Sequence, residues 1–270
     1  MLSGEDILAS LGKHIIIYPF DPSQLRGSTY NLKVGKFVWL HPDPGTSGSV
    51  RPLEGVETPT GRRFDIPPGA LVHILTEEVI YVDSTVAGLL HSKVDMVTKG
   101  FSHISTTLDP NWQGPLLITM QNCSSKTLAL WQGETFVKLS FYRLSHPTKI
   151  QHNNPPGRSD RLRALGLQFP EGQENFLDEP INWNKDHLRK TFFESVGWRE
   201  VQKRKLHRLR RFVGWSQWIL IFALCILAIS LVNGPSWMST EVRAVIIGAS
   251  FSTVIYFLLQ KLDALIKGEL

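Results

Sequence analysis

The amino-acid sequence predicts a mainly β protein, a distorted β-barrel or jelly roll that is followed by a helical segment and a two-helix hairpin. Short runs rich in β-branched and aromatic residues recur over residues 14–144, and turn-forming residues separate them. No helical pattern stands between these runs, which favours an all-β barrel or jelly roll. After residue 150 the strand pattern ends, and basic and then apolar stretches replace it.

Composition limits the number of domains and the chemistry. A length of 270 residues allows one or two domains, and 42% hydrophobic residues are enough for a core. Cys123 and Cys225 lie in very different contexts, which argues against a disulfide and against a metal site. Residues 1–11 carry acids and lack an apolar stretch, so they do not resemble a signal peptide.

The β domain is expected over residues 1–150. A short helix begins it, with Ser3 as the N-cap, acidic residues in its first turn and Gly12 at its end. His41–Gly61 is rich in Pro, Gly, Ser and Thr, which indicates a loop. The predicted strands are His14–Tyr18, Tyr30–Leu40, Ala70–Leu75, Val79–Val82, Ala87–Leu90, Leu116–Gln121, Leu128–Leu130 and Phe136–Leu144.

Residues 151–213 are expected to form a linker and a basic amphipathic helical segment. Within them, Arg158–Leu167 is typical of a short basic helix and Trp183–Trp198 of an amphipathic helix. Residues 214–260 are then the predicted transmembrane hairpin, and residues 261–270 a cytoplasmic tail.

Two apolar stretches predict that hairpin. Trp215–Val232 has no charge and is long enough to cross a bilayer at about 1.5 Å per residue, and Ala244–Leu259 is a second, shorter candidate. Basic residues flank both outer sides, including the run Arg199–Arg211, so the positive-inside rule places both termini in the cytoplasm. Anionic membrane lipid explains this basic run, and no nucleic-acid partner is expected. The alternative is a buried helix pair in a soluble protein.

The stretch Ser102–Asn122 carries the candidate chemistry. Asp109 and Pro110 predict a type I turn, because Pro presets φ and Asp can bond the backbone ahead of it. The alternation that follows predicts a strand, so Asp109 lies where a turn enters a strand. A carboxylate held there can align and polarise a water. Alternatively, Asp109 only satisfies its own backbone.

Three segments, in order, resemble the dUTPase and dCTP deaminase superfamily. Thr107–Gly114 is similar to its Ile-Asp-x-x-Tyr/Trp-x-Gly motif, and Ile15–Gly35 to its Pro-Phe-x-x-x-x-Leu-x-x-x-Ser-Tyr-Asp-Leu-x-x-Gly motif. Trp131–Phe141 resembles its Pro-Gly-x-x-Ile-x-Gln-Leu-x-Phe strand. The resemblance covers roughly residues 1–150. It implies a homotrimer with sites at subunit interfaces and a deoxyribonucleotide partner of the dUTP or dCTP type.

The resemblance also implies a site. Asp109 matches the carboxylate that, in dUTPases, positions the water attacking the α-phosphate of dUTP. No cofactor is implied with certainty and no metal ligands are recognised, although Mg²⁺ could accompany a triphosphate substrate. The implied nucleotide-binding residues are Ser92, Lys93, Thr106, Thr107, Trp112, Gln113, Gly114 and Lys138.

Two departures from the family weaken the implied catalysis. Thr119 stands where dCTP deaminases have the Glu of Leu-Glu-x-x-Asn, and threonine cannot act as that base at neutral pH. In the phosphate motif Gly-Arg-Ser-Ser-x-x-Arg, Lys93 replaces an arginine and Asp95 replaces a serine, where it would repel phosphate. Asn31 replaces an aspartate of the first motif and is interpreted as structural.

Two functions follow from this pattern. The first is a membrane-anchored protein that binds deoxyribonucleotides with weak or lost catalysis, as a nucleotide sensor or an assembly module. The predicted tether and the missing Glu favour it. The alternative is an active enzyme, a dUTP diphosphatase that uses Asp109 or, with less support, a dCTP deaminase. Asp109 and the order of the motifs favour that alternative.

Overall fold

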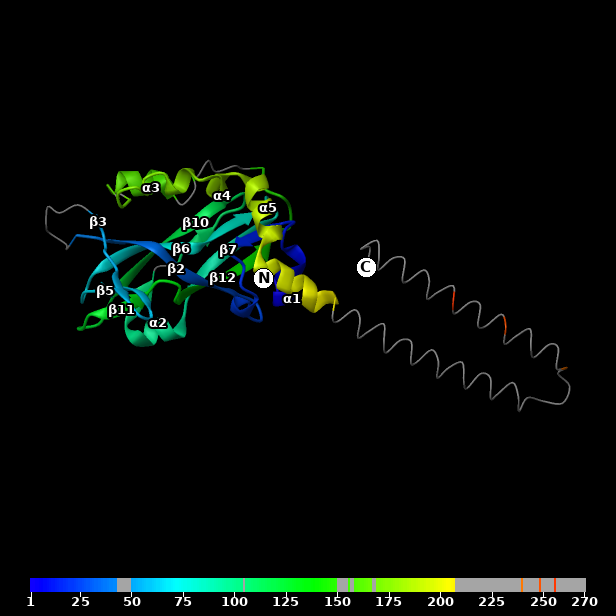
Figure 1. Cartoon of the computed structure of the whole chain (residues 1–270), viewed down its shortest axis with the longest axis horizontal. Helices are drawn as coiled ribbons and strands as arrows, with labels where there is room; N and C mark the ends of the chain where they lie inside the picture. The colour runs from blue at the N-terminus through cyan, green and yellow to red at the C-terminus, as the bar shows by residue number, and fades with distance from the viewer. Residues whose placement is uncertain are drawn as a thin grey trace. The chain divides into compact units, whose positions relative to one another are not determined.

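The structure is a computed structural model that describes residues 1–42, 50–103, 105–149, 155, 158–166, 169–206, 239, 248 and 255. The chain forms two compact units, Met1–Val201 and Gln202–Leu270. The first unit holds the helices and strands described below, and strands dominate it (Figure 1). The prediction of a mainly β fold is therefore confirmed.

The N-terminal helix α1 (Gly4–Ser10) begins where it is predicted to begin. The Ser3 hydroxyl accepts the Asp6 N–H at 3.1 Å, and the Asp6 carboxylate accepts the Ser3 N–H at 2.9 Å, which is a capping box. The strands are β1 (Ile15–Tyr18), β2 (Tyr30–Leu40), β3 (Arg51–Pro52), β4 (Val56–Thr58), β5 (Gly61–Ile66), β6 (Leu71–Val82), β7 (Val86–Ser92), β8 (Phe101–His103), β9 (Thr107–Leu108), β10 (Gln113–Asn122), β11 (Leu128–Trp131) and β12 (Thr135–Arg143).

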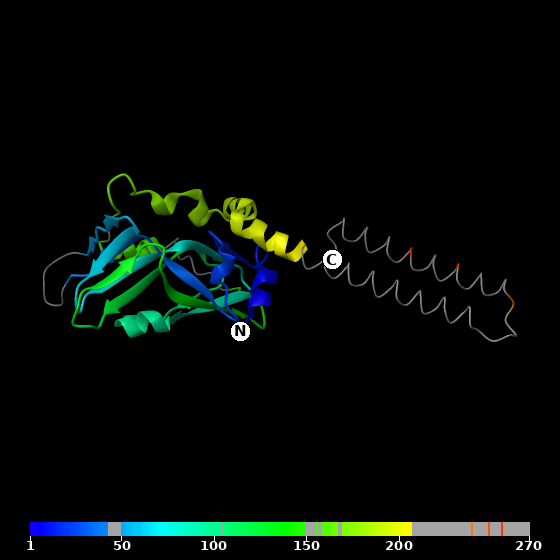
Figure 2. The ribbon, with the colours of Figure 1, turned by 60° about the horizontal axis from the view of Figure 1, so that its bottom comes forward.

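These strands form two antiparallel sheets. The larger sheet has the order β8–β10–β6–β2–β12–β7–β9, with β1 paired to β6 and β3 paired to β2. The smaller sheet has the order β11–β5–β4. The long strand β6 pairs with β1, β2 and β10, so it joins most of the larger, curled sheet together (Figure 2).

The prediction differs from the structure in two segments. Ala70–Leu75 and Val79–Val82 belong to one strand, β6, because the charged residues between them do not form a turn. Glu78 is buried instead, and its carboxylate accepts the Lys33 N–H at 2.9 Å. The predicted loop His41–Gly61 contains β3 and β4, while residues 43–49 lie outside the described part.

Buried apolar side chains form two clusters on opposite faces of the larger sheet. The main cluster includes Val38 and Ile74, and the alternation of a strand places Phe37, Trp39 and Leu75 on the other face. We call the cluster on this second face the outer cluster. Its buried members are Phe37, Trp39, Val50, Leu75, Leu162 and Leu177, and Leu117, Phe169 and Phe176 pack against it.

The helices after the last strand lie along one side of the β domain, and α2 (Val94–Lys99) lies on the opposite side (Figures 1 and 2). They are α3 (Ser159–Ala164), the 3-10 turn η3 (Phe176–Asp178), α4 (Pro180–Trp183) and α5 (Lys185–Glu194), and residues 196–201 are also helical. The amphipathic helix predicted over Trp183–Trp198 is interrupted at Asn184 and Ser195. Asn184 is the N-cap of α5, since its side chain accepts the His187 N–H at 3.0 Å.

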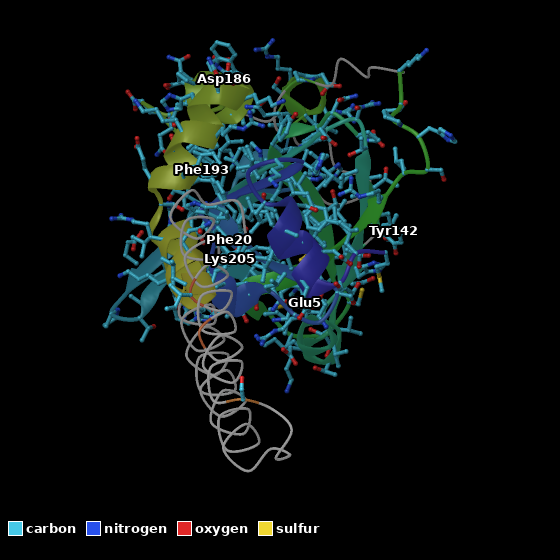
Figure 3. All side chains as sticks on the ribbon, turned by 90° about the vertical axis from the view of Figure 1, so that its right-hand side faces the viewer. Glu5, Phe20, Tyr142, Asp186, Phe193 and Lys205 are labelled. Atoms are coloured by element: carbon cyan, nitrogen blue, oxygen red, sulfur yellow. The ribbon has the colours of Figure 1, made fainter. Side chains whose placement is uncertain are left out.

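Helix α5 joins the main cluster through its apolar face. Leu188 and Phe192 are fully buried, and the Phe192 ring meets Phe20 edge-on with centroids 6.4 Å apart. Figure 3 labels Phe20 and, on α5, Phe193. The neighbouring Phe193 is 42% exposed. The predicted amphipathic character of this segment therefore corresponds to its packing.

The predicted two-pass membrane location, with cytoplasmic termini, is corrected by the structure. Within the described residues, no helix combines the length and the apolar character needed to cross a bilayer. The stretches on which that prediction depended, 215–232 and 244–259, lie outside the described residues except for Gly248 and Ile255.

Candidate functional site

Asp109 lies between β9 and β10 and is half-buried. The Thr107 hydroxyl donates to its Oδ1 at 3.3 Å. Two residues later, Asn111 has a φ of 63°, whereas the corresponding residue of a type I turn has a negative φ. The predicted turn type is therefore wrong. A positive φ at this position fits a type II turn, which asparagine tolerates better than most residues.

The rest of the turn makes contacts within the chain. Trp112 is buried, and its indole N–H donates to the Gly114 carbonyl at 3.0 Å. With the Gln113 amide assigned so that its oxygen faces α5, that oxygen accepts the N–H groups of Asn184 at 3.0 Å and Lys185 at 3.2 Å. Gln113 thus caps the first turn of α5. Gly114 has a φ of 129°, which other residues rarely adopt.

Lys93 and Ser92 are also engaged. The Lys93 side chain is only 13% exposed, its ammonium donates to the hydroxyl of Thr135, and it lies 3.6 Å from the Asp95 carboxylate. The Ser92 hydroxyl and His103 Nδ1 are 2.8 Å apart. These contacts hold the start of α2 against β12, and they occupy two groups that the resemblance implies for phosphate.

Lys138 differs from Lys93. On β12 it pairs with Asn31 of β2 and with His91 of β7, and it is half-exposed. Its ammonium has no ion pair or hydrogen bond with any described residue. Asn31 is 4% exposed, and its Oδ1 likewise lacks a partner in the described part of the chain. Lys138 is therefore the predicted phosphate-binding cation whose charge remains available.

The register divides the predicted site residues into two groups. Ser92 pairs with Val137, and Leu89 pairs with Thr107, so Ser92, Lys138 and Thr107 lie on the neighbouring strands β7, β12 and β9. Thr106 is exposed just before β9. Trp112, Gln113 and Gly114 lie at the start of β10, at the other side of the strand order. The Asp109 turn connects the two groups.

Thr119 lies on β10 directly opposite His73 of β6, and its hydroxyl is 2.9 Å from His73 Nδ1. His73 is 7% exposed. Burial, assisted by the charge of His41, lowers the pKa of His73 to about 4, so the imidazole is neutral at pH 7. Sequence analysis missed His73, because nothing in a single strand shows which residue of a distant strand lies opposite.

Arg158 is a second residue that the sequence analysis missed. Its guanidinium binds the Asp160 carboxylate at 2.8 and 2.9 Å. This bond, together with the charges of Asp160 and Asp109, raises the pKa of Arg158. The charge of Asp109 thus acts on a cation from the segment that follows β12.

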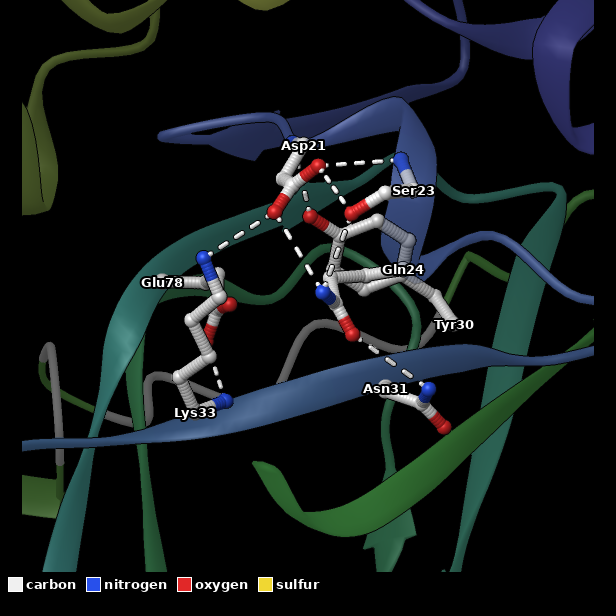
Figure 4. Close-up of polar contacts among 7 residues, drawn as sticks. All are labelled: Asp21, Ser23, Gln24, Tyr30, Asn31, Lys33 and Glu78. Atoms are coloured by element: carbon white, nitrogen blue, oxygen red, sulfur yellow. Dashed lines mark hydrogen bonds and ion pairs between the residues drawn. The ribbon is translucent and has the colours of Figure 1, made fainter. Parts of the chain in front are cut away.

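A separate polar cluster surrounds Asp21 and Glu78 (Figure 4). Asp21 accepts the N–H and the hydroxyl of Ser23 at 2.9 and 2.6 Å, and the Lys33 ammonium at 3.2 Å. Its burial would raise the pKa of Asp21, but these bonds outweigh burial and lower it to about 2. Burial of Glu78 dominates over its bond from Lys33 and raises the pKa of Glu78 to about 8.

Comparison with known proteins decides the family. The sequence profile described as dCTP deaminase-like matches residues 1–144, slightly more than half of the chain. The chain belongs to the dCTP deaminase-like family. It is 30% identical to a dCTP deaminase of Thermococcus kodakarensis over 137 residues, which are 51% of this chain and 81% of that relative. It is 27% identical to a dUMP-forming dCTP deaminase of Salinispora arenicola over 164 residues, which are 57% of this chain and 85% of the relative.

A solved structure gives a weaker likeness. The crystal structure of 2'-deoxycytidine 5'-triphosphate deaminase from Agrobacterium tumefaciens is similar to this dCTP deaminase-like chain with a TM-score of 0.42 and 12% identity. The match spans 63% of this chain and about half of that protein, 54%.

The candidate site of this dCTP deaminase-like protein combines a cation, a carboxylate and a hydroxyl–imidazole pair. Lys138 supplies a free positive charge and Asp109 a half-buried carboxylate. On β10, Thr119 and the neutral His73 bond to each other. Within the described residues, no group of three or more His, Cys, Asp or Glu side chains could hold a metal ion.

Proposed function

We propose that this dCTP deaminase-like protein binds deoxyribonucleotides and turns them over weakly or not at all, as a nucleotide sensor or an assembly module. The observation that carries the proposal is Thr119. It occupies the place that the resemblance gives to the deaminase Glu, and its hydroxyl bonds to His73 at 2.9 Å. A threonine hydroxyl cannot take a proton from water at neutral pH, so the base for deamination is missing.

The ligand is proposed to be a nucleotide of the dUTP or dCTP type. Lys138 supplies a point charge for phosphate, and the exposed Thr106, just before β9, and Thr107, on β9, supply hydroxyls. Lys93 is unavailable in this conformation, because Thr135 and Asp95 occupy its ammonium. Affinity for a full triphosphate is therefore expected to be lower than in a site with two free cations, and Mg²⁺ could accompany such a ligand.

A homotrimer is part of the proposal. The predicted site residues of one chain lie on or next to β7, β12 and β9 and, across the Asp109 turn, at the start of β10. A second copy could bring the β10 group of one subunit to the β7–β12 group of another, as the resemblance implies. Sedimentation equilibrium on the purified protein measures this directly, and a monomer that still binds nucleotide would contradict it.

The alternative function is a dUTP diphosphatase that uses Asp109. It is favoured by the position of this carboxylate, half-buried and fixed by the Thr107 hydroxyl at 3.3 Å. Replacing Asp109 with Asn keeps the shape and removes the charge that polarises water. If the alternative holds, pyrophosphate release should fall about 100-fold or more in Asp109→Asn. An unchanged rate leaves Asp109 with only its turn role.

One experiment tests the proposed function. Purified protein is titrated calorimetrically with dCTP, dUTP and their monophosphates, and ammonia and pyrophosphate release are followed in parallel. We expect heat of binding, with turnover well below about 1 per second. Lys138→Gln should weaken binding about tenfold, whereas Lys126→Gln, at an exposed lysine outside the site, should not. Ammonia release from dCTP at ordinary enzyme rates, or no binding at millimolar ligand, would contradict the proposal.

A further inference from the structure

Two histidines face each other on the outer side of the larger sheet. His73 of β6 pairs with Trp39 of β2, and His41 follows Trp39 by two residues, so both histidines stand on the same face. Their ring centroids are 5.7 Å apart, and the ring planes make an angle of 62°. His41 is half-buried and His73 is buried. Of the two rings, His41 is therefore the more accessible to solvent.

The hydrogen bond of His41 determines which of its ring nitrogens carries the proton. Its Nδ1 is 3.0 Å from the carbonyl oxygen of Pro42. A carbonyl oxygen only accepts, so Nδ1 must be the protonated nitrogen, and Nε2 of the neutral ring keeps its lone pair. A bond from Nδ1–H to a backbone carbonyl is the support that metal-binding histidines in proteins commonly have.

The surroundings of His73 lead to the same arrangement. Its Nδ1 is 2.9 Å from the Thr119 hydroxyl, which can accept as well as donate. Its Nε2 is fully buried and has no partner among the described residues. A buried N–H without an acceptor is rare, so the proton belongs on Nδ1, directed at Thr119, and Nε2 keeps its lone pair.

We propose that His41 and His73 form a site for a divalent transition-metal ion of the Zn²⁺ or Cu²⁺ class, each histidine binding through Nε2. Imidazole nitrogens are preferred ligands of these ions. At a metal–nitrogen distance of about 2.0–2.1 Å, two imidazoles on one tetrahedral ion place their centroids about 5–6 Å apart, and the observed separation is 5.7 Å. Because no third His, Cys, Asp or Glu joins them within the described residues, water would fill the other positions.

The proposal is independent of nucleotide binding. An ion held by His73 Nε2 would lie across the ring from Thr119, whose hydroxyl supports the ring at Nδ1. Thr119→Val removes that support without changing the shape of the side chain. It should therefore weaken metal binding by about tenfold, the usual effect of losing a partner behind a metal-ligating histidine.

The test uses the full chain without a polyhistidine tag, stripped with a chelator and titrated with zinc sulfate by calorimetry. We expect one ion per chain and binding at least about tenfold weaker in His41→Gln and in His73→Gln. His187→Gln, at an exposed histidine on α5, is the matched control and should bind like the native protein. With Cu²⁺ in place of Zn²⁺, paramagnetic resonance should show coupling to two imidazole nitrogens.

His73 is buried, so His73→Gln could lose stability as well as the metal. His41→Gln changes a half-buried ring at the end of β2 and carries the test if circular dichroism shows that His73→Gln is unfolded. Failure of the native chain to bind Zn²⁺ and Cu²⁺ would overturn the proposal. Equal binding by native protein and His41→Gln would overturn it as well.

Discussion

The main cluster and the outer cluster of buried side chains differ in where their residues come from. The main cluster consists almost entirely of residues within 1–144, the part that matches the family, and α5 adds Leu188 and Phe192. The outer cluster combines Phe37, Trp39 and Leu75 of the sheet with residues that follow the matched part. The family domain thus fills its own interior, while a later segment covers one of its outer faces.

The outer cover is held mainly by aromatic contacts. The Phe37 ring meets Phe169 at 4.9 Å and Phe176 at 4.8 Å, and Trp39 meets Phe169 at 5.3 Å, all edge-on. The Lys36 ammonium lies 4.6 Å from the Phe176 ring centroid. Such contacts add about 0.5–1.5 kcal/mol each to the burial of area. The face that carries Thr119 and His73 is therefore partly covered by the chain itself.

The largest expected effect tests whether α5 belongs to the main cluster. Phe192→Ala removes a fully buried ring and should lower the free energy of unfolding by about 3–5 kcal/mol in urea. Phe193→Ala, next to it and 42% exposed, is the matched control and should cost much less. Similar losses of unfolding free energy in the two variants would mean that α5 packs only loosely on the main cluster. The main cluster would then not be the more strongly packed of the two clusters.

The next effect concerns the outer cluster. Leu162→Ala removes a side chain that is 1% exposed and should cost about 2–3 kcal/mol, at the lower end for buried leucines because this cluster is small. It should also speed proteolytic cleavage within residues 158–178, since the cover is weakened. Leu165→Ala, 38% exposed, is the control. A loss as large as that of Phe192→Ala would make the two clusters energetically alike.

A smaller effect tests the contact between the candidate site and α5. Gln113→Ala removes the side chain that accepts two N–H groups at the start of α5, and should cost about 1 kcal/mol, as for other helix caps. Gln132→Ala, at an exposed glutamine in a turn, should leave the free energy of unfolding within about 0.5 kcal/mol. If the two variants have equal stability, Gln113 is free to serve the nucleotide instead.

The sequence predicted the elements whose pattern is local. The β-rich run Tyr30–Leu40 matches β2 at both ends, and Ser3 matches the N-cap of α1, with Asp6 three residues away. The prediction divides β6 because Glu77 and Glu78 interrupt the apolar run, although the bond from the Lys33 backbone allows Glu78 to be buried. A charged residue inside a strand can receive a hydrogen bond from a distant element. The residues next to it in the sequence do not reveal that bond.

In the candidate site, too, the contacts between residues distant in sequence could not be predicted. The motif segments located Asp109, Lys93 and Lys138, yet only the register shows that Lys138 lies beside Asn31 while Lys93 is held by Thr135. The capping role of Gln113 was equally hidden, since its partner helix begins about 70 residues later in the chain. Residue types indicated the candidate groups, which stay a prediction, and tertiary pairing determined which of them are already engaged within the described residues.

Glu78 is expected to make the folding stability depend on pH. It belongs to the polar cluster between η1 (Pro22–Gln24), β2 and β6. Its burial raises the pKa from 4.5 to about 8 in the folded chain. The folded state therefore holds this proton more tightly than the unfolded state does. The resulting stabilisation is complete below about pH 4.5 and is lost as the pH rises through about 8.

Glu78→Gln has no such proton to lose and keeps nearly the same shape. The urea midpoints of the variant and the native protein should be close at about pH 5, and the variant should become the more stable of the two toward about pH 9. Glu171→Gln, at an exposed glutamate of the covering segment, should follow the native curve throughout. If the difference between Glu78→Gln and the native protein does not change with pH, Glu78 does not titrate in this range. The polar cluster would then contribute equally to stability at about pH 5 and at about pH 9.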